Sequence, residues 1–234
     1  MAGGVSVLSP PRKASPAIFK DTMEKIKIYT GNLYGKDLER AKELSLGIMI
    51  ASSASNFKPN SDWKGMPLAL DNGAFQCWSR GYPFMETPFF DTLWQCYKLQ
   101  LDLDFIVCPD IVADGLNSMR FSLGYARERL LGCKRLALAV QDGMAPHHVA
   151  NGIQDDHFTT IFVGGTLDWK WSSLPEWVAM AHENGMKCHV GRCGTENKIK
   201  KAIELGVDSV DSTSIARNKS WHIIENLYSD GLFT

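Results

Sequence analysis

TENKIKKAIELGVDSVDS, residues 195–212, contains a helix followed directly by a strand. Thr195 is a residue type that caps the start of a helix, and Gly206 is typical of the position just past a helix end. The segment 207–212 is then a short apolar strand that carries Asp208 and ends at Asp211. This unit raises two questions, namely how often it recurs and what a carboxylate does at the end of a buried strand.

The same alternation runs through the whole chain and predicts its fold. Short apolar runs rich in β-branched residues recur, and each is followed by a polar or glycine signal and then a helix-like segment. Eight such strands alternating with helices predict a single (β/α)8 TIM-type barrel over residues 25–234, preceded by an N-terminal arm at 1–24. An open doubly wound sheet is the alternative. The predicted strands are 25–31, 46–52, 66–73, 104–110, 135–143, 160–165, 187–191 and 207–212.

Four helices are predicted from their apolar spacing and end signals. The helix at 86–100 would pack through Phe90, Leu93, Trp94 and Tyr97, and the one at 116–131 through Met119, Leu123, Ala126 and Leu130. The third would begin near Pro175 and end at Asn184-Gly185, and the fourth spans 195–206. The segment DNGAFQCWSRGYPF, residues 71–84, is predicted to be a long loop.

Bulk composition excludes some classes of protein. The 234 residues are 44% hydrophobic, which is enough for one sizeable core. No apolar run reaches the roughly 20 residues that span a bilayer, and the N-terminus lacks the order of a signal peptide, so a cytoplasmic protein without a membrane segment is expected. The net charge of −1 argues neither for nor against nucleic acid.

The six cysteines predict buried, reduced thiols rather than a metal site. No pair has the C-x-x-C spacing of a zinc ribbon or a redox motif. Cys188, His189 and Cys193 in CHVGRC can be imagined as a ligand set, but a strand does not offer the turn spacing that close metal ligands need. No metal and no cofactor are therefore expected.

The predicted strand ends gather polar groups. In a parallel barrel the catalytic groups lie at the carboxyl ends of the strands. Carboxylates, an amide and small glycines there suit a site that hydrogen-bonds a planar polar ligand. Each aspartate taken alone is more often a helix cap or loop residue than a catalyst. Taken together, the strand ends indicate an enzyme of unspecified class. These end residues are Asp71-Asn72-Gly73, Pro109-Asp110, Gln141-Asp142-Gly143, Gly164-Gly165, Gly191 and Asp211-Ser212.

Taken in order, the strand ends resemble the tRNA-guanine transglycosylase superfamily. DNGAFQ resembles that family's D-S-G-G-F/Y-Q, AVQDG its V-Q-G-G, and VGGT its G-G-L/S loop. HVGRCGTENKIKKAIELGVDSVD resembles M-G-V-G-T-P-E-D followed by G-V-D-M-F-D. The match covers about residues 66–217. Members of this family are pentosyltransferases that exchange a guanine base in a nucleic acid for a 7-deazaguanine.

The resemblance implies a role for each matched residue. Asp211 matches the nucleophile that attacks the sugar C1′ and holds a covalent glycosyl intermediate. Asp71 matches the acid/base aspartate that moves a proton to and from the base, and this role is favoured over the alternative of an Asx-turn at DNG because the following Gly-Ala-Phe-Gln also matches. Asp208 matches a second aspartate and is expected to be structural.

The base-binding residues follow from the same match. Asp110 matches the aspartate that reads N1 and the exocyclic amine of guanine, with Asp114 as an alternative alignment. Gln141 matches the contact to the base O6 or 7-substituent, and Gly164 and Gly165 match backbone donors. Phe75 would stack on the base, although an aromatic residue after a strand is as often part of the core.

Departures from the family pattern change the expected polymer. The family's zinc site, C-x-C-x-x-C…H, is not found after Asp211, and Ala74 replaces the second glycine of D-S-G-G-F. The long insertions that grip tRNA are missing as well. We therefore expect DNA as the partner, as in the compact phage-type members that insert 7-deazaguanines such as 7-cyano-7-deazaguanine, with tRNA as the alternative. A phage origin would place the protein in the host cytoplasm, and a homodimer is possible.

The nucleic-acid contacts and the competing functions complete the predictions. Arg192 and Arg217 are candidate phosphate contacts, whereas Lys198, Lys200 and Lys201 better fit a solvated helix face. Trp78, Trp169 and Trp171 are candidate base-stacking residues or core residues.

Two other functions compete with this interpretation. One is a barrel enzyme for a small phosphorylated substrate, with GRCGTEN before a helix as the phosphate site. Another is a non-catalytic partner subunit, which the presence of both Asp71 and Asp211 argues against.

Overall fold

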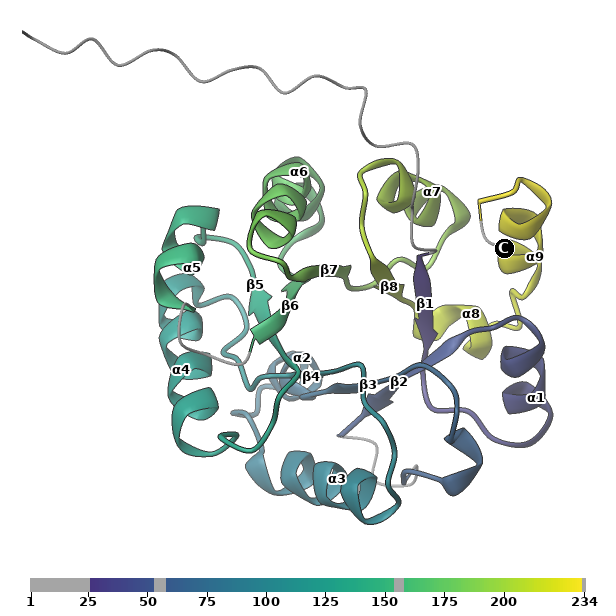
Figure 1. The fold of residues 1–234 in the computed structure, drawn as a ribbon, viewed down its shortest axis with the longest axis horizontal. Helices are drawn as coiled ribbons and strands as arrows, with labels where there is room; N and C mark the ends of the chain where they lie inside the picture. Colours follow the sequence, from purple (N-terminus) through teal and green to yellow (C-terminus); the bar gives the residue numbers. More distant parts are fainter. Residues whose placement is uncertain (1–25, 53–57, 154–157, 233–234) are drawn as a thin grey trace, which may run out of the picture.

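The fold is a closed parallel barrel. A computed structural model describes residues 26–52, 58–153 and 158–232, so the predicted arm at 1–24 lies outside the described residues. All eight predicted strands form, each pairs with the next, and β8 returns to β1. The prediction of a (β/α)8 barrel is confirmed, and the open doubly wound sheet is wrong (Figure 1). The strands are β1 Lys27–Thr30, β2 Gly47–Ala51, β3 Leu68–Asp71, β4 Phe105–Val107, β5 Leu136–Val140, β6 Phe158–Val163, β7 Lys187–Val190 and β8 Ser209–Asp211.

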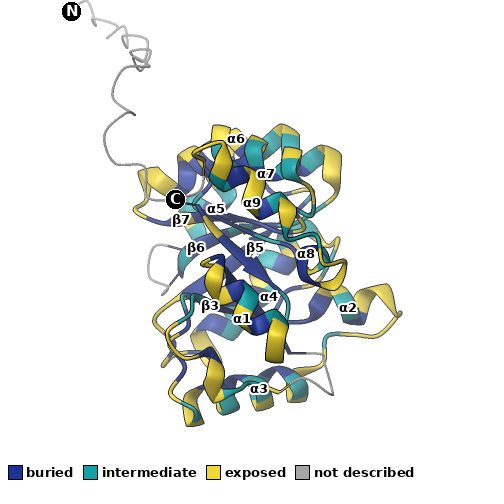
Figure 2. Cartoon of the chain, turned by 90° about the vertical axis from the view of Figure 1, so that its right-hand side faces the viewer, coloured by how far each residue is buried: buried dark blue, intermediate teal, exposed yellow. Residues whose placement is uncertain are grey.

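Helices surround the barrel and cover its outer face. Figure 2 shows the strands buried between helices whose outward faces are exposed. The helices are α1 Gly35–Glu43, the 3-10 helix η1 Ser61–Trp63, α2 Ala74–Ser79, α3 Glu86–Lys98, α4 Gly115–Glu128, α5 Pro146–Gly152, α6 Leu167–Glu183, α7 Glu196–Glu204, α8 Thr213–Arg217 and α9 His222–Ser229.

Alternation along each strand divides the core into two parts. In β5 the side chains of Leu136, Leu138 and Val140 pack outward against the helices, while Ala137 and Ala139 point into the barrel. The small interior side chains leave room for the rings of Tyr29 and Phe105. The barrel interior is therefore filled by side chains and is not a pore.

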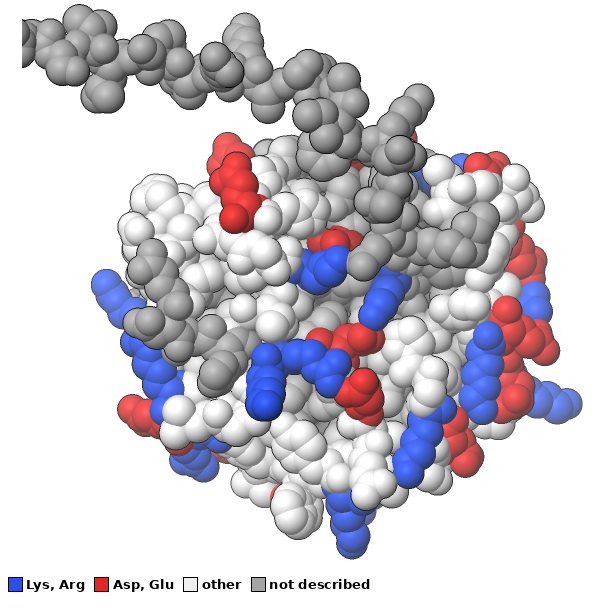
Figure 3. All heavy atoms as spheres, in the orientation of Figure 1, with Lys and Arg blue, Asp and Glu red and all other residues white. Residues whose placement is uncertain are grey.

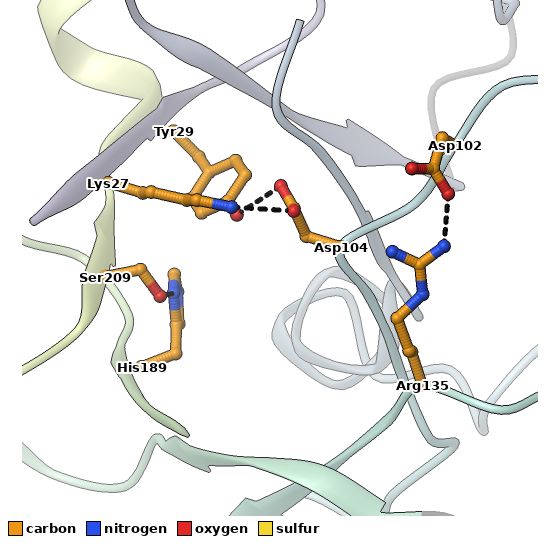
Figure 4. A network of polar contacts seen from close by, with 7 residues as sticks. All are labelled: Lys27, Tyr29, Asp102, Asp104, Arg135, His189 and Ser209. Atoms are coloured by element: carbon orange, nitrogen blue, oxygen red, sulfur yellow. Dashed lines mark hydrogen bonds and ion pairs between the residues drawn. The ribbon is translucent and has the colours of Figure 1, made fainter. Parts of the chain in front are cut away.

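Charged side chains cover the barrel at the amino-terminal ends of its strands. Figures 1 and 3 view this end, because the strands run clockwise in chain order and α2, which follows the carboxyl end of β3, is drawn as more distant. Side chains of both signs lie next to one another there (Figure 3). Lys27 Nζ lies 2.7 Å from Asp104 Oδ1, and the Tyr29 hydroxyl donates to Asp104 Oδ2 at 2.8 Å (Figure 4). Arg135 pairs with Asp102 beside them.

Three predictions about the helices are wrong in detail. Residues 74–79 of the predicted loop form α2, because Asn72 Oδ1 accepts from the Ala74 N–H at 2.8 Å and starts a helix. Helix α6 begins eight residues before Pro175, which lies inside it. A proline that the tertiary packing tolerates inside a helix looks, from sequence alone, like a helix start.

The third error concerns which face of α3 is buried. Phe89, Leu93 and Cys96 face the core, whereas Trp94 is 68% exposed. The spacing 89, 93, 96 is as helical as 90, 94, 97 and differs from it by one residue, or about 100° around the helix. The predicted face of α4 is correct: Leu123 and Ala126 are buried, Leu130 follows the helix and is buried too, and Met119 packs against the same core.

Candidate active site

The carboxyl end of β3 supplies an aspartate held by its own turn. Asp71 is the last residue of β3, and its carboxylate accepts hydrogen bonds from the backbone N–H groups of Asn72 and Gly73. Gly73 has a φ of +79°, a left-handed conformation that glycine adopts without a steric penalty. The predicted Asx-turn is therefore present, and it fixes the carboxyl group at the rim without excluding a catalytic role.

Asp71 lies close enough to two other carboxylates to titrate abnormally. Burial, then the negative charge of Asp211 and to a smaller extent that of Asp110, raise its pKa from an ordinary 3.8 to about 7, against the lowering effect of the two backbone donors. A carboxyl group with a pKa near neutrality can both give and take a proton under physiological conditions. The barrel thus brings together three carboxylates that are far apart in the sequence.

Asp110 follows β4 and is fixed through Asn72. Asn72 Nδ2 donates to Asp110 Oδ1 at 2.7 Å and to the Cys108 carbonyl at 2.8 Å. Burial raises the pKa of Asp110 to about 6 against the lowering effect of the hydrogen bond from Asn72. The second oxygen, Oδ2, lies at a long 3.5 Å from Gln141 Nε2, so it has capacity left for a ligand. Asp114, the alternative alignment, is exposed at the start of α4.

Gln141 makes contacts other than those predicted. Its Nε2 donates to the Ile111 carbonyl at 2.9 Å and to Ser118 Oγ at 2.7 Å, and its Oε1 accepts from the Ala113 N–H at 2.5 Å. Both amide protons are therefore used within the protein. In this conformation Gln141 holds the loop between β4 and α4 and offers a ligand only the remaining lone pair of Oε1.

The two glycines after β6 also differ from each other. The Gly164 N–H donates to the Val140 carbonyl at 2.9 Å, so it is not available to a base. Gly165 has a φ of +72°. Of the two glycines, only Gly165 is therefore left to donate a backbone N–H to a base. Asp142 fixes the loop, because its carboxylate accepts from the Thr166 N–H at 2.7 Å and from Thr166 Oγ1 at 2.6 Å.

The close packing at Gly165 predicts a large loss of stability on substitution. A Cβ there would lie 2.6 Å from Asp142 Oδ2 and 2.6 Å from the Trp169 ring, in a left-handed conformation. We expect Gly165→Ala to lower the free energy of unfolding by roughly 2–4 kcal/mol, measured by urea denaturation. Gly185→Ala is the matched control, since Gly185 has a φ of +68° and open space around it. Equal losses in the two variants would show that the contacts to Asp142 and Trp169 contribute nothing.

Asp211 ends β8 and is held by residues that follow β7. His189 Nε2 lies 3.2 Å from Asp211 Oδ2, and the Arg192 N–H lies 3.4 Å from Oδ1. Gly191 makes room for the carboxylate, because a Cβ there would lie 3.2 Å from Asp211 Oδ2 and 3.0 Å from the Phe162 ring. Asp211 is therefore an aspartate at a strand end with donors on both oxygens, not a helix cap on the surface.

Arg192 crosses the mouth of the barrel. Its guanidinium lies 4.9 Å from the centre of the Phe75 ring and donates to the Gly165 carbonyl. Phe75 is 47% exposed, so it is a rim residue and not part of the core. Arg192 itself adopts a left-handed φ of +64°. Helix α2 after β3 and the loops after β6 and β7 thus meet through one arginine.

Sequence reasoning missed two residues of this site. Lys170 on α6 is 1% exposed and donates from Nζ to the Gly191 carbonyl at 2.5 Å. Burial, and then the charge of Arg192, lowers the pKa of Lys170 to about 8. Its position among tryptophans in LDWKW gave no signal. His189 was considered only as a metal ligand, and its contact with Asp211 depends on the pairing of β7 with β8.

Several other predicted residues lie away from the carboxylates. Asp208 accepts from the Cys188 N–H at 2.7 Å and pairs with His182 near the amino end of β8, in agreement with a structural role. Lys200 pairs with Glu196 and Asp230 on the outer surface. Arg217 is exposed at the end of α8. Of the three tryptophans, Trp78 is 52% exposed beside Phe75, and Trp169 and Trp171 pack against the core.

Within residues 26–52, 58–153 and 158–232, no group of three His, Cys, Asp or Glu side chains is arranged to hold a metal ion. All six cysteines are free and buried, as predicted. The helices in the same ranges are too short or too polar to cross a membrane. No protein-family model matches the chain, and no curated protein matches it at a significant level.

Proposed function

We propose that this chain is a base-exchange transglycosylase that replaces guanine in DNA with a 7-deazaguanine through a covalent aspartyl-glycosyl intermediate. The observation that carries the proposal is the pair Asp71 and Asp211. They sit at one rim in different surroundings. The pKa of Asp71 is raised to about 7 by burial and by the charge of Asp211, whereas Asp211 is flanked by N–H groups. Two carboxyl groups separated in this way suit an acid and a nucleophile.

The proposed reaction proceeds in two displacements. An oxygen of Asp211 attacks C1′ of the nucleotide, the new C1′–O bond forms, and the bond from C1′ to the glycosidic nitrogen breaks with its electron pair passing to guanine. Asp71 gives its proton to the departing base. The resulting Asp71 carboxylate then takes a proton from the incoming 7-deazaguanine, whose nitrogen attacks C1′ and releases Asp211.

Recognition of the base is assigned to the groups beside this pair. Asp110 Oδ2, which retains capacity for a ligand, would accept from N1–H and the exocyclic amine of guanine. The exposed ring of Phe75 offers a stacking surface. Arg192 now lies over that ring, so a base entering the same space would have to displace its guanidinium. An extrahelical base is required, because the Asp211 side chain is only 14% exposed and an enzyme cannot reach the atom it attacks while the base is stacked in a duplex.

DNA is proposed over tRNA because of the sequence departures, and Arg192 and Arg217 are the proposed phosphate contacts. An exchange assay tests both the reaction and the polymer. Purified protein is incubated with radiolabelled guanine or 7-cyano-7-deazaguanine and, separately, with duplex DNA, single-stranded DNA and bulk tRNA. Label in DNA supports the proposal, label in tRNA alone keeps the chemistry and overturns the polymer, and label in none of them from folded protein contradicts the function.

Asp110 provides a sharper test of base recognition. We expect Asp110→Asn to reduce discrimination between guanine and adenine by about 10- to 100-fold, because an amide donor then faces the guanine donors. The variant keeps an oxygen for the Asn72 bond, so the fold should persist. Competition between the two bases in the exchange assay measures the effect. Asp114→Asn, on the exposed alternative, should leave discrimination unchanged, and the reverse result would move the recognition role to Asp114.

A further inference from the structure

We propose that His189, backed by Ser209, is a positioning residue that holds Oδ2 of Asp211 and so makes Oδ1 the attacking oxygen. This inference rests on the proposed function and assigns a role that the sequence pattern did not. It starts from the pairing of β7 and β8, where His189 lies directly opposite Ser209. Because Ser209 and Asp211 are two residues apart on one strand, both side chains point into the barrel, as His189 does.

The hydrogen bonds define the state of the imidazole. His189 Nε2 lies 3.2 Å from Asp211 Oδ2, and Nδ1 lies 2.8 Å from Ser209 Oγ (Figure 4 shows the second pair). An ionised carboxylate can only accept, so Nε2 must carry the proton. The neutral ring then accepts at Nδ1 from the Ser209 hydroxyl. Asp211 thereby selects the tautomer, and the Ser209 hydroxyl, which can donate or accept, completes the arrangement by donating to Nδ1.

Packing holds the imidazole against aromatic rings. His189 is fully buried, and it stacks on Phe162 with ring centres 4.7 Å apart and an angle of 28°. Phe105 and Tyr29 lie on its other sides at 5.1 and 5.8 Å. Burial lowers the pKa of His189, which favours the neutral ring that this arrangement needs. A ring locked by three aromatic neighbours can fix the carboxylate that it contacts.

The two oxygens of Asp211 are thereby made different. Oδ2 faces His189 and the bare Cα of Gly191, while Oδ1 has only a long contact of 3.4 Å with the Arg192 N–H, from the loop that follows β7. When Oδ1 bonds to C1′, Oδ2 becomes the carbonyl oxygen of the ester and still accepts from Nε2–H. The same hydrogen bond stabilises the carboxylate when the arriving base releases it. Positioning of this kind affects the rate of the displacement more than the binding of substrate.

The tautomer is tested directly and without substrate. Two-bond proton–nitrogen correlation spectra of selectively labelled protein distinguish Nε2–H from Nδ1–H. We expect the Nε2–H form in the wild type, and a mixture of tautomers in Asp211→Ala, which removes the acceptor that selects this form. A wild-type ring in the Nδ1–H form would overturn the inference. This result stands even if no polymer is labelled, so failure of the proposed function and failure of the positioning role are distinguishable.

Kinetics test the consequence for the reaction. We expect His189→Leu to lower kcat for exchange by about 10²-fold with little change in KM, because Asp211 loses its orientation. His189→Gln, which offers an N–H at nearly the same place, should recover activity to within about tenfold of wild type. A purely structural role predicts instead that both variants lose folded protein and that the folded fraction keeps its kcat. Full kcat in His189→Leu would contradict the proposal.

Discussion

Replacement of Asp211 by alanine is expected to abolish base exchange, with a loss in kcat of about 10⁴-fold or more. The reason is that no other described residue holds a carboxylate between His189 and the Arg192 N–H, where the sugar carbon would be attacked. Without the nucleophile the two displacements cannot share a covalent intermediate. The remaining groups at the rim would still bind the base, so KM should change far less than kcat.

The measurement is the covalent adduct itself. Labelled DNA is incubated with the protein without an incoming base, denatured and separated, and the wild type should retain label on the protein. Asp211→Ala and the isosteric Asp211→Asn should both give none. Asp208→Asn is the matched control, because Asp208 accepts from the Cys188 N–H near the other end of the strand. An adduct of undiminished yield in Asp211→Ala would remove Asp211 as the nucleophile.

Replacement of Asp71 by asparagine is expected to lower kcat by about 10²- to 10⁴-fold, the usual contribution of a general acid. Asparagine retains an oxygen for the N–H groups of Asn72 and Gly73, so the turn should be preserved. It cannot give a proton to the departing guanine. Because the pKa of Asp71 is about 7, exchange by the wild type should fall as the pH rises through that value and the acid form is lost. In Asp71→Asn this dependence should be absent.

Asp71→Asn, although it lowers activity, should make the folded protein more stable at neutral and alkaline pH. The pKa of Asp71 is about 7 in the folded protein against an ordinary 3.8, so between these values the folded state binds more protons than the unfolded state. Stability contributed by this group is therefore present at low pH and is lost as the pH rises toward 7. Thermal unfolding at pH 8 should show Asp71→Asn to be more stable than wild type, with the difference shrinking at pH 5. Wild-type exchange or an unchanged pH profile in this variant would contradict the acid/base assignment.

The contrast between the two variants separates their roles. Loss of Asp211 removes a charge that raises the pKa of Asp71. Any residual exchange by Asp211→Asn should therefore begin to fall at a lower pH than exchange by the wild type. Loss of Asp71 removes a proton donor but leaves Asp211 in contact with His189. Weak adduct formation together with slow turnover that does not depend on pH is therefore the expected signature of Asp71→Asn alone.

The sequence predicted the order of elements because that information is local. Each strand could be recognised from a short apolar run and its end signal, and the Thr195 cap was confirmed, with Oγ1 accepting from the Lys198 N–H. Knowing that parallel strands share one rim then placed Asp71, Asp110 and Asp211 together. Where two local patterns were equally regular, as in α3, or where a proline was tolerated, as at Pro175, the prediction failed.

By itself the sequence determined the barrel and the carboxylates at its rim, because periodicity and strand ends depend only on neighbours along the chain. Tertiary structure alone decided what each side chain contacts. His189 meets Asp211 across 22 positions, and Gln141 reaches Ser118 across 23, a support for the loop after β4 that the sequence did not predict. Buried Lys170 became part of the site only through α6 packing beside β7. Such partners follow from strand register and helix packing, which bring together residues whose separation in the chain carries no pattern.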